Sequence, residues 1–521
     1  MLRLNKIIFF ISIFLLVFAI SFAQNSLDFD LWARLIMGKH IIEAHSIMYK
    51  DIISFTPTHT WFDPEWITSA LIYLIQIKFG LLGLNILKGL LIFLLVVSIN
   101  IAIKEKNVQN PYNLGYYLII VFLLKQVGIF YALRCQVLTF IFCAMWILFL
   151  EKIKKGNNKY LIYLVILSLI WLNCHGGIIA GVGLLGLYLI GEFLNKNDYK
   201  KYFLALVVIF FIFFINPWGV DYLKFILDSS FLDRSWIAEW QSPFTFSFKN
   251  IFLYQFLVVI TYFCYFYKIY LKKLKFKDLD KTKLLIILTA TVLSFKYIKH
   301  TGLMVVLYSI FMYDDYFLTF NDLAEKLRKY LQFEINSKKY FNLIKNIVLY
   351  LIIYVYSLTN LITSNLNYTT TKNVLSNYPI SSINFLEQNN IKGNILSPFQ
   401  YNSFMGYRLY PNIKIFMDGR QEQVYYSNIF DEMMFFYLYL GKNPLEILDK
   451  YDIDILMVEK EFPIYKHLKE IKNFKVIYDN GANVILIKEN KLKNDYKYEY
   501  FDSEKLMDNI FKTNLDFGVK K

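Results

Sequence analysis

Long apolar runs alternate with short polar, lysine-rich segments over most of the chain. A helix that crosses a bilayer needs about 20 mostly apolar residues, and runs approaching that length recur as far as residue 362. This pattern predicts a polytopic α-helical membrane protein with about 11 transmembrane helices. The predicted spans are residues 7–23, 81–103, 114–133, 137–150, 160–172, 178–194, 202–215, 251–266, 284–295, 301–313 and 347–362.

Basic residues cluster in alternate connections between these spans, which fixes an expected orientation. By the positive-inside rule these connections are cytoplasmic, so the N-terminus lies inside and the chain after residue 362 lies outside. Residues 64–79 are apolar enough to form a further span, but counting them would invert every later loop. We therefore expect this segment to lie along the membrane surface as an amphipathic helix.

The first span also has features of a secretory signal. Ser21 and Ala23 stand at the small-residue positions of a cleavage site before Gln24. The apolar run is long for a signal peptide, so a retained anchor is favoured, and the topology downstream is the same in both cases.

Short strand-like and helix-like runs alternate after the last span, which predicts an α/β domain on the outer side. We expect three parts: a transmembrane domain at 1–362 with a first outer loop at 24–80, an exoplasmic α/β domain at 363–490, and a charged, solvated tail at 491–521. The expected strands are residues 394–397, 413–418, 455–459, 476–478 and 483–487, with helices near 383–389, 429–440 and 465–471.

Composition supports the membrane interpretation and changes the meaning of the charge. Hydrophobic residues make up 56% of the 521 residues and charged residues only 19%, which excludes a soluble enzyme and a disordered chain. The net charge is +15, and the basic residues lie between the apolar runs. Anionic lipid headgroups are therefore expected partners, and nucleic acid is not. The 4 cysteines imply no disulfide framework.

Carboxylates at both ends of the first outer loop are the first candidates for chemistry. Asp28 and Asp30 follow the first span, and Asp63 and Glu65 precede the surface helix. A carboxylate there can deprotonate an acceptor hydroxyl or hold a divalent cation against a lipid phosphate. For Asp63 the favoured alternative is capping of the helix that begins at Pro64, whereas function is favoured for Asp30.

Basic residues on the outer side need an explanation, because they oppose the positive-inside bias. Binding of a lipid phosphate is one explanation; the alternatives are a membrane-flanking anchor for Arg134, a turn role for His175, and pairing of the remaining cations with Asp233 or Glu239. The candidate phosphate-binding residues are Arg134, His175, Lys296 and His300, and Lys299 lies in the same loop as the last two.

Asp418 and Arg420 follow a predicted strand of the outer domain, at the carboxyl end where open α/β sheets bind ligands. A simple turn with a local ion pair is the favoured alternative. The sequence contains no P-loop, GxSxG, HExxH or paired CxxC motif, so the usual indications of nucleotide-driven transport and zinc chemistry are missing.

Several motifs, in order, resemble a group of bacterial polytopic proteins that is similar to the GT-C superfamily of glycosyltransferases, which use lipid-linked sugars. The chain departs from this group at Arg34, where a histidine is common, and at Cys135, where a proline is common. The motifs are Asp28-x-Asp30-Leu-Trp, Ser54-Phe-Thr, Asp63-Pro-Glu-Trp, Arg134-x-Gln, Trp171-Leu-Asn-Cys-His-Gly-Gly, Asn216-Pro-Trp-Gly, Glu239-Trp and Asp418-Gly-Arg.

The resemblance implies inverting sugar transfer from a polyprenyl-phosphate sugar to an envelope glycan, lipid or protein on the outer face of the inner (cytoplasmic) membrane. It assigns the base, or the group that supports a metal, to Asp28 or Asp30, with Asp30 preferred. Two other functions stay open: a non-catalytic, membrane-anchored glycan or lipid binder, and an envelope glycan polymerase or ligase. A transporter is least favoured, because few charged residues lie within the spans.

Overall fold

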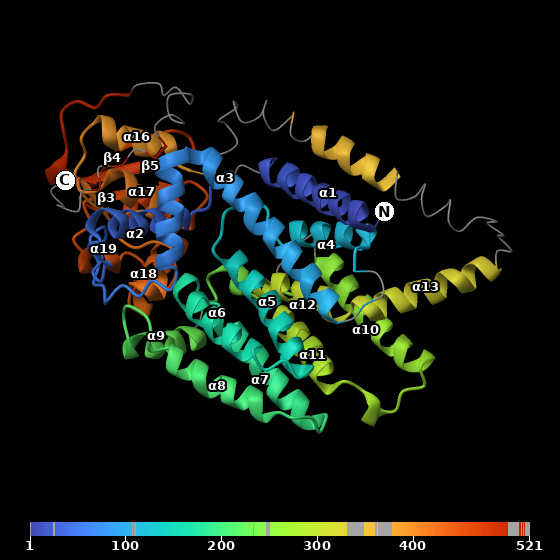
Figure 1. The fold of residues 1–521 in the computed structure, drawn as a ribbon. Helices are drawn as coiled ribbons and strands as arrows, with labels where there is room; N and C mark the ends of the chain where they lie inside the picture. Colours follow the sequence, from blue (N-terminus) through green and yellow to red (C-terminus); the bar gives the residue numbers. More distant parts are fainter. Residues whose placement is uncertain are drawn as a thin grey trace. The chain divides into compact units, whose positions relative to one another are not determined.

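The computed structural model describes residues 2–23, 27–106, 108, 111–232, 234–245, 251–330, 348–359, 362, 378–498, 510, 511, 513 and 515. Its internal contacts divide the chain into two compact units, and each unit combines segments that are far apart in the sequence. Met1–Gln24 and Asn85–Ser364 form the helical unit, while Asn25–Leu84 and Asn365–Lys521 form the α/β unit. Figure 1 shows the helices and the sheet along the chain.

The described apolar runs predicted as spans lie in helices, although the boundaries differ. The run predicted at 114–133, for example, is helical only to Gln126. The helices are α1 (Leu2–Phe22), α3 (Trp66–Glu105), α4 (Leu114–Gln126), α5 (Gln136–Lys154), α6 (Tyr160–Cys174), α7 (Ile178–Leu194), α8 (Lys200–Ile212), α9 (Val220–Phe231), α10 (Ile251–Leu271), α11 (Lys281–Lys296), α12 (Thr301–Phe311) and α13 (Tyr313–Tyr330), with a further apolar helix at Val348–Thr359.

Among the described helices, α3 and α5 are long and apolar enough to cross a membrane by themselves. The pair Ile298–Phe311 and Tyr313–Leu327, bent by 66°, would make a third if it forms one broken span. Several of the other helices are apolar but shorter, so the number of about eleven spans stays a prediction. The apolar helices indicate a membrane protein.

Ion pairs join the ends of the helices that we predict to face the cytoplasm. Lys106 Nζ lies 3.3 Å from Glu151 Oε1, and Lys154 Nζ lies 2.7 Å from Glu192 Oε1. The hydroxyl of Thr282 also donates to Glu192, at 2.7 Å. Many of the lysines that set the predicted orientation therefore also pair with acidic side chains of neighbouring helices.

The long helix α3 is broken at Gly80, which has φ 58° and ψ −149°. The break separates the predicted surface helix from the predicted span that follows it. In the first half, Ser69 and Ile72 are buried while Leu71 and Phe79 are exposed. This half is therefore amphipathic, with an exposed apolar face, and its position along a membrane surface stays a prediction.

The α/β unit contains a five-stranded mixed sheet in the order β2-β1-β3-β5-β4. Strand β1 is parallel to β2 and β3, whereas β5 is antiparallel to β3 and β4. The strands are β1 (Gly393–Leu396), β2 (Ile413–Ile415), β3 (Ile455–Glu459), β4 (Phe474–Asp479) and β5 (Asn483–Lys488). The helices are α2 (Leu31–Ala44), α16 (Ile380–Gln388), α17 (Phe399–Leu409), α18 (Ser427–Leu438) and α19 (Glu446–Lys450), while the helix expected at 465–471 is a 3₁₀ segment at Pro463–Glu470.

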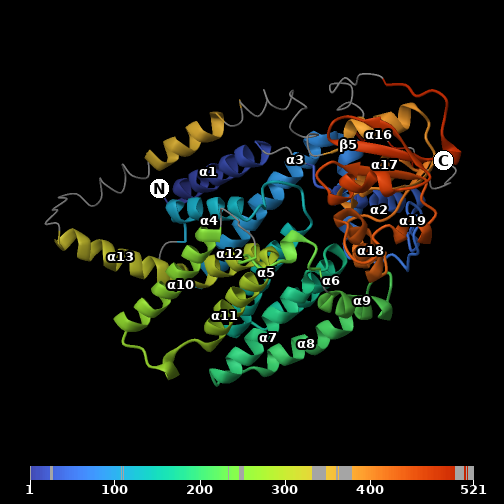
Figure 2. The same ribbon diagram turned by 180° about the vertical axis from the view of Figure 1, so that it is seen from behind.

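The first outer loop is part of this sheet unit. Phe55 N donates to Ile415 O at 3.1 Å, and Ile415 N donates to Ile53 O at 2.9 Å, so the loop pairs with the edge strand β2. Helix α2 packs on α17, as Figures 1 and 2 both show. We expected residues 24–80 to belong to the transmembrane domain, whereas Asn25–Leu84 form one compact unit with the C-terminal part of the chain.

The C-terminal segment also packs on the α/β unit where it is described. Lys497 N donates to Asn389 Oδ1 at 2.7 Å, and Tyr498 OH donates to Ile477 O at 2.7 Å. Ile510 and Leu515 are only 1% and 4% exposed. The expectation of a solvated tail is therefore wrong for Ile510 and Leu515, whose apolar side chains are buried, whereas Lys497 and Tyr498 are exposed as expected.

Candidate functional site

Asp28 and Asp30, in the turn before α2, differ in their exposure to solvent. Asp28 is buried, and its Oδ1 accepts a hydrogen bond from Asp30 N at 3.3 Å. Leu31 N donates to the carbonyl oxygen of Asp28 at 3.2 Å, which continues the turn into the helix. Asp30 occupies the N-cap position of α2 and is exposed. Asp28 thus holds the turn, while Asp30 is accessible to a substrate.

The loop that follows β2 lies directly against Asp30. A β-carbon added at Gly419 would stand 2.9 Å from Asp30 Oδ1, so a side chain at that position would crowd the carboxylate. Gly419 lies between Asp418 and Arg420, at the carboxyl end of a parallel strand, where open α/β sheets bind ligands. The structure thus brings together two candidate motifs that are almost 400 residues apart in the sequence.

Asp418 and Arg420 are buried beneath this contact and pair with each other. Arg420 Nε lies 2.8 Å from Asp418 Oδ1, and Arg420 Nη1 lies 2.6 Å from Asp51 Oδ1. The guanidinium carbon stands 4.5 Å from the centroid of the buried Trp61 ring. Burial raises the pKa of Asp51, but the charge and hydrogen bond of Arg420 outweigh it, so this pKa lies below its ordinary value. This cluster joins the outer loop to the sheet, and its side chains are not accessible to a substrate.

Asp63 and Glu65 share one arginine at the start of α3. Asp63 Oδ1 accepts the backbone N–H of Glu65 at 2.9 Å, in the turn that precedes α3, whereas the capping role favoured from the sequence was expected for a helix beginning at Pro64. Arg34 Nη1 pairs with Asp63 and lies 2.9 Å from Glu65 Oε2. Burial and the neighbouring Glu65 raise the pKa of Asp63, and Arg34 offsets only part of this. Arg34, at the position where a histidine is common, therefore balances two carboxylates.

Aromatic side chains surround the Asp28–Asp30 turn, and sequence analysis missed their role. Trp32 Nε1 donates to Tyr378 OH at 3.0 Å, and Tyr378 OH donates to Leu27 O at 3.3 Å. The Phe29 ring centroid lies 5.0 Å from that of Tyr378 and 5.9 Å from that of Tyr401. Burial, with the charges of Asp28 and Asp30, raises the pKa of Tyr378. No local sequence signal identifies Tyr378, because it is 346 residues from Trp32.

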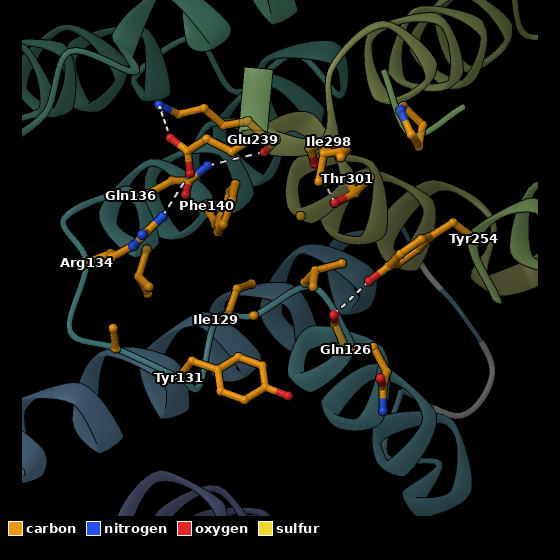
Figure 3. Close-up of a pocket in the computed structure, with 17 residues that line it drawn as sticks. Gln126, Ile129, Tyr131, Arg134, Gln136, Phe140, Glu239, Tyr254, Ile298 and Thr301 are labelled. Atoms are coloured by element: carbon orange, nitrogen blue, oxygen red, sulfur yellow. Dashed lines mark hydrogen bonds and ion pairs between the residues drawn. The ribbon is translucent and has the colours of Figure 1, made fainter. Parts of the chain in front are cut away.

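The helical unit contains a cavity of about 360 Å³, shown in Figure 3. It lies near the end of α4, the start of α5, the 3₁₀ segment Ala238–Trp240 and the start of α12. One part of its wall is apolar, with Ile129, Val137 and Phe140. The other part carries the charged side chains of Arg134, Glu239 and Lys299. The cavity thus combines a hydrocarbon-like surface with an ionic cluster.

The carboxylate of Glu239 bridges the two cations of this cluster. Its Oε2 lies 2.9 Å from Arg134 Nη1, and its Oε1 lies 3.2 Å from Lys299 Nζ. Burial raises the pKa of Glu239, but the charges and hydrogen bonds of Lys299 and Arg134 outweigh it and hold this pKa below its ordinary value. Figure 3 shows Glu239 and Arg134 pointing toward each other. Glu239 is therefore an anion at neutral pH.

Three of the predicted phosphate-binding residues lie outside the wall of this cavity as it is described. Lys296 Nζ stands 5.0 Å from the Tyr297 ring centroid, and the His300 ring centroid lies 6.2 Å from that of Trp240. His300 thus flanks the segment that carries Glu239, whereas Lys296 contacts Tyr297, whose ring centroid lies 5.4 Å from that of Trp240. His175 Nδ1 accepts the backbone N–H of Gly177 at 2.9 Å, which is the turn role considered from the sequence. Asp233 lies outside the described residues.

Among the described residues, no group of three or more His, Cys, Asp or Glu side chains is arranged to hold a metal ion. Asp28 and Asp30 supply two carboxylates. Magnesium is often bound by only one or two carboxylates together with water and substrate phosphates. The donor set is therefore compatible with a cation that a substrate helps to hold.

Solved structures of one protein share this fold. The oligosaccharyltransferase of Archaeoglobus fulgidus, tethered to an acceptor peptide containing the NVT sequon, matches with a TM-score of 0.54 and 12% identity. The matched region covers 86% of this chain and 69% of the oligosaccharyltransferase chain. The apo form of the same enzyme gives a TM-score of 0.53 and 11% identity, with the same coverage. No protein-family model and no curated protein matches the sequence. The chain therefore has a GT-C-like fold, and at this identity the likeness concerns the fold alone.

Proposed function

We propose that this protein is a membrane glycosyltransferase that transfers a sugar from a polyprenyl-phosphate donor to a cell-envelope acceptor on the outer face of the inner membrane. The observation that carries the proposal is the exposed carboxylate of Asp30, held at the start of α2 beside Gly419 in a GT-C-like fold. An exposed, well-positioned carboxylate is what deprotonation of an acceptor hydroxyl requires.

In the proposed reaction, Asp30 takes the proton of the acceptor hydroxyl while the oxygen of that hydroxyl attacks the anomeric carbon of the sugar. The bond from that carbon to the donor phosphate breaks, so the configuration inverts and the lipid phosphate leaves. We separately propose that Arg134 and Lys299, which line the cavity of the helical unit, bind a lipid phosphate. Lys296 stays a candidate for the same role. Burial and the charges of Lys299 and Lys296 lower the pKa of His300 to about 4, so His300 stays a candidate as a neutral hydrogen-bond donor.

The proposed partners are membrane lipids, the lipid-linked sugar and an envelope glycan, lipid or protein. Because the structural neighbour carries a tethered acceptor peptide, a protein acceptor belongs among those to be tested. Asp30 and Asp28 are the residues proposed to hold a divalent cation if the reaction uses one, and the cation would supply charge stabilisation to the leaving phosphate.

Mass spectrometry of the lipid that copurifies with the detergent-solubilised protein tests the donor class. The test variant is Arg134→Ala/Lys299→Ala, and Lys224→Ala, an exposed lysine of the same unit, is the control. A polyprenyl phosphate, with or without sugar, in the wild type and the control but not in the double variant would support the proposal. Only bulk phospholipid in all three would contradict the assigned phosphate site.

A further inference from the structure

Glu239 occupies the position between Arg134 and Lys299 that an incoming anion would need. Each of its two carboxylate oxygens binds one cation, at 2.9 and 3.2 Å, which is the bridging arrangement that two phosphate oxygens can make. The side chains of Arg134, Glu239 and Lys299 are 44%, 33% and 30% exposed. The bridge is therefore accessible from outside and is not sealed in the core.

Beyond this bridge, the cavity offers an apolar wall to the remainder of a ligand. Val127, Ile129, Val137 and Phe140 contribute to the lining. The volume of about 360 Å³ lies in the range of small-molecule sites. A phosphate attached to a hydrocarbon chain would match both parts of the site, whereas inorganic phosphate would use only the charged part.

We propose that Glu239 is a built-in competing anion, which bridges Arg134 and Lys299 in the absence of ligand and is displaced from both when the phosphate of an isoprenoid lipid binds. The identity of the lipid rests on the proposed function. The exchange involves no covalent step, because one anion replaces another on the same two cations.

The surroundings of Glu239 allow its side chain to leave while its backbone stays in place. Trp240 is held from its ring faces by Arg234 and Lys299, whose cationic groups lie 4.4 and 4.5 Å from the ring centroid. Ile298 N donates to Gln241 O at 3.0 Å, which fixes the next residue of the segment. Lys299 thus keeps its contact with Trp240 after Glu239 moves away, so both cations stay available to the phosphate.

The energetic balance also favours exchange. Partly exposed ion pairs contribute little net stability, because solvent competes for both charges. A phosphate monoester, such as farnesyl phosphate or the polyprenyl phosphate released by sugar transfer, carries more charge than a carboxylate and has more acceptor oxygens, so it forms stronger charge-assisted hydrogen bonds with the same cations. The carboxylate of Glu239 therefore holds Arg134 and Lys299 near each other but competes only weakly with a phosphate for them.

The test is equilibrium binding of farnesyl phosphate to the full-length protein in detergent, comparing the wild type with Glu239→Gln. The amide has nearly the same shape but lacks the charge that competes, so we expect binding about two- to fivefold tighter. Glu325→Gln, at an exposed glutamate of α13 that pairs with Lys329, is the control and should leave the affinity unchanged. Glu239→Ala is the second variant, to be used if the glutamine variant does not fold, and should shift the affinity in the same direction.

Equal or weaker farnesyl phosphate binding by folded Glu239→Gln or Glu239→Ala would overturn the inference. Inorganic phosphate and vesicles containing phosphatidic acid are the other probes. Wild-type binding of inorganic phosphate or of these vesicles as tight as that of farnesyl phosphate would overturn the isoprenoid assignment while leaving the competing anion in place. Because the readout is binding, a gain with farnesyl phosphate would stand even if the protein transferred no sugar, which separates this inference from the proposed function.

Discussion

At the residue scale, Asp28 and Asp30 show how neighbouring carboxylates take different roles. Asp28 is buried and accepts the backbone N–H of Asp30, whereas Asp30 is exposed beside Gly419. The sequence singles out both residues but does not rank them by accessibility. The structure supplies that distinction, which depends on a loop almost 400 residues further along the chain.

Arg420 is the residue whose loss should damage the α/β unit most. Arg420→Met would leave the carboxylates of Asp51 and Asp418 buried without their cation. Breaking such a pair costs about 3–5 kcal/mol, so we expect a clear fall in the thermal unfolding temperature. Lys475→Met removes an exposed lysine that pairs with Glu489, and it should have almost no effect. Similar unfolding temperatures for both variants would show that the buried cluster is not a stabilising centre.

The same cluster predicts a dependence of stability on pH. Arg420 lowers the pKa of Asp51 in the folded protein, so this carboxylate stabilises the fold above its unfolded pKa of about 3.9. That contribution is lost as the pH falls through the lowered folded pKa. Asp51→Asn should therefore unfold at a lower temperature than the wild type at pH 7, and the difference should shrink below about pH 4. A difference that stays constant from pH 7 to pH 3 would contradict the prediction.

How far the site could be predicted from sequence depends on the distance between its parts. The Asp28-x-Asp30 and Asp418-Gly-Arg420 motifs are local patterns, and both were found. Tyr378 and Asp51 could not be identified, because their roles arise from contacts with residues hundreds of positions away. Pairing with Glu239 was considered for Lys299 but not for Arg134, and the sequence does not show that a cavity adjoins these residues.

At the element scale, the break in α3 separates two helices of different character. The hydrophobic pattern predicts the boundary near residue 80, since an amphipathic run gives way to a continuous apolar one. The pairing of residues 53–55 with β2 was not predictable in the same way, because the sequence does not show which distant strand this short segment pairs with. The edge strand supplies the hydrogen-bonding groups that order it.

Gly80→Ala should destabilise the protein through the backbone alone. Its φ of 58° and ψ of −149° lie in a region that is costly for other residues, and no atom lies within 4 Å of an added β-carbon. We expect a loss of about 1–3 kcal/mol, measured as a lower unfolding temperature in detergent. Gly183→Ala, within α7 and equally free of contacts, should be neutral or stabilising. Equal behaviour of the two variants would mean that the break at Gly80 is not maintained.

At the scale of the whole molecule, the α/β unit is built from two separated parts of the chain. Residues Asn25–Leu84 supply the buried Trp32 and Trp61 and the segment that pairs with β2. The order of strands and helices in the C-terminal part was largely predicted, but this shared core was not. Sequence patterns describe each segment, whereas the core arises from contacts between segments.

The C-terminal part should consequently not fold alone. A fragment of residues 365–521 would expose the edge of β2 and the apolar surface that covers Trp32 and Trp61. We expect poor solubility and a denatured-like circular dichroism spectrum for this fragment. Residues 25–79 joined to residues 365–521 by a flexible glycine-serine linker should give a cooperative unfolding transition. A folded, cooperative 365–521 fragment would contradict the shared core.

Sugar transfer by Asp30→Asn is the measurement that tests whether Asp30 is the general base. Purified wild-type and variant proteins would be given a lipid extract that contains radiolabelled polyprenyl-linked sugars, together with envelope material, and the label in the acceptor fraction would be counted. Loss of a general base predicts a fall of about 10²–10⁴-fold in rate with an unchanged unfolding temperature. Asp452→Asn, an exposed carboxylate of the same unit, should keep full activity. An Asp30→Asn protein that transfers sugar as fast as the wild type would contradict the account.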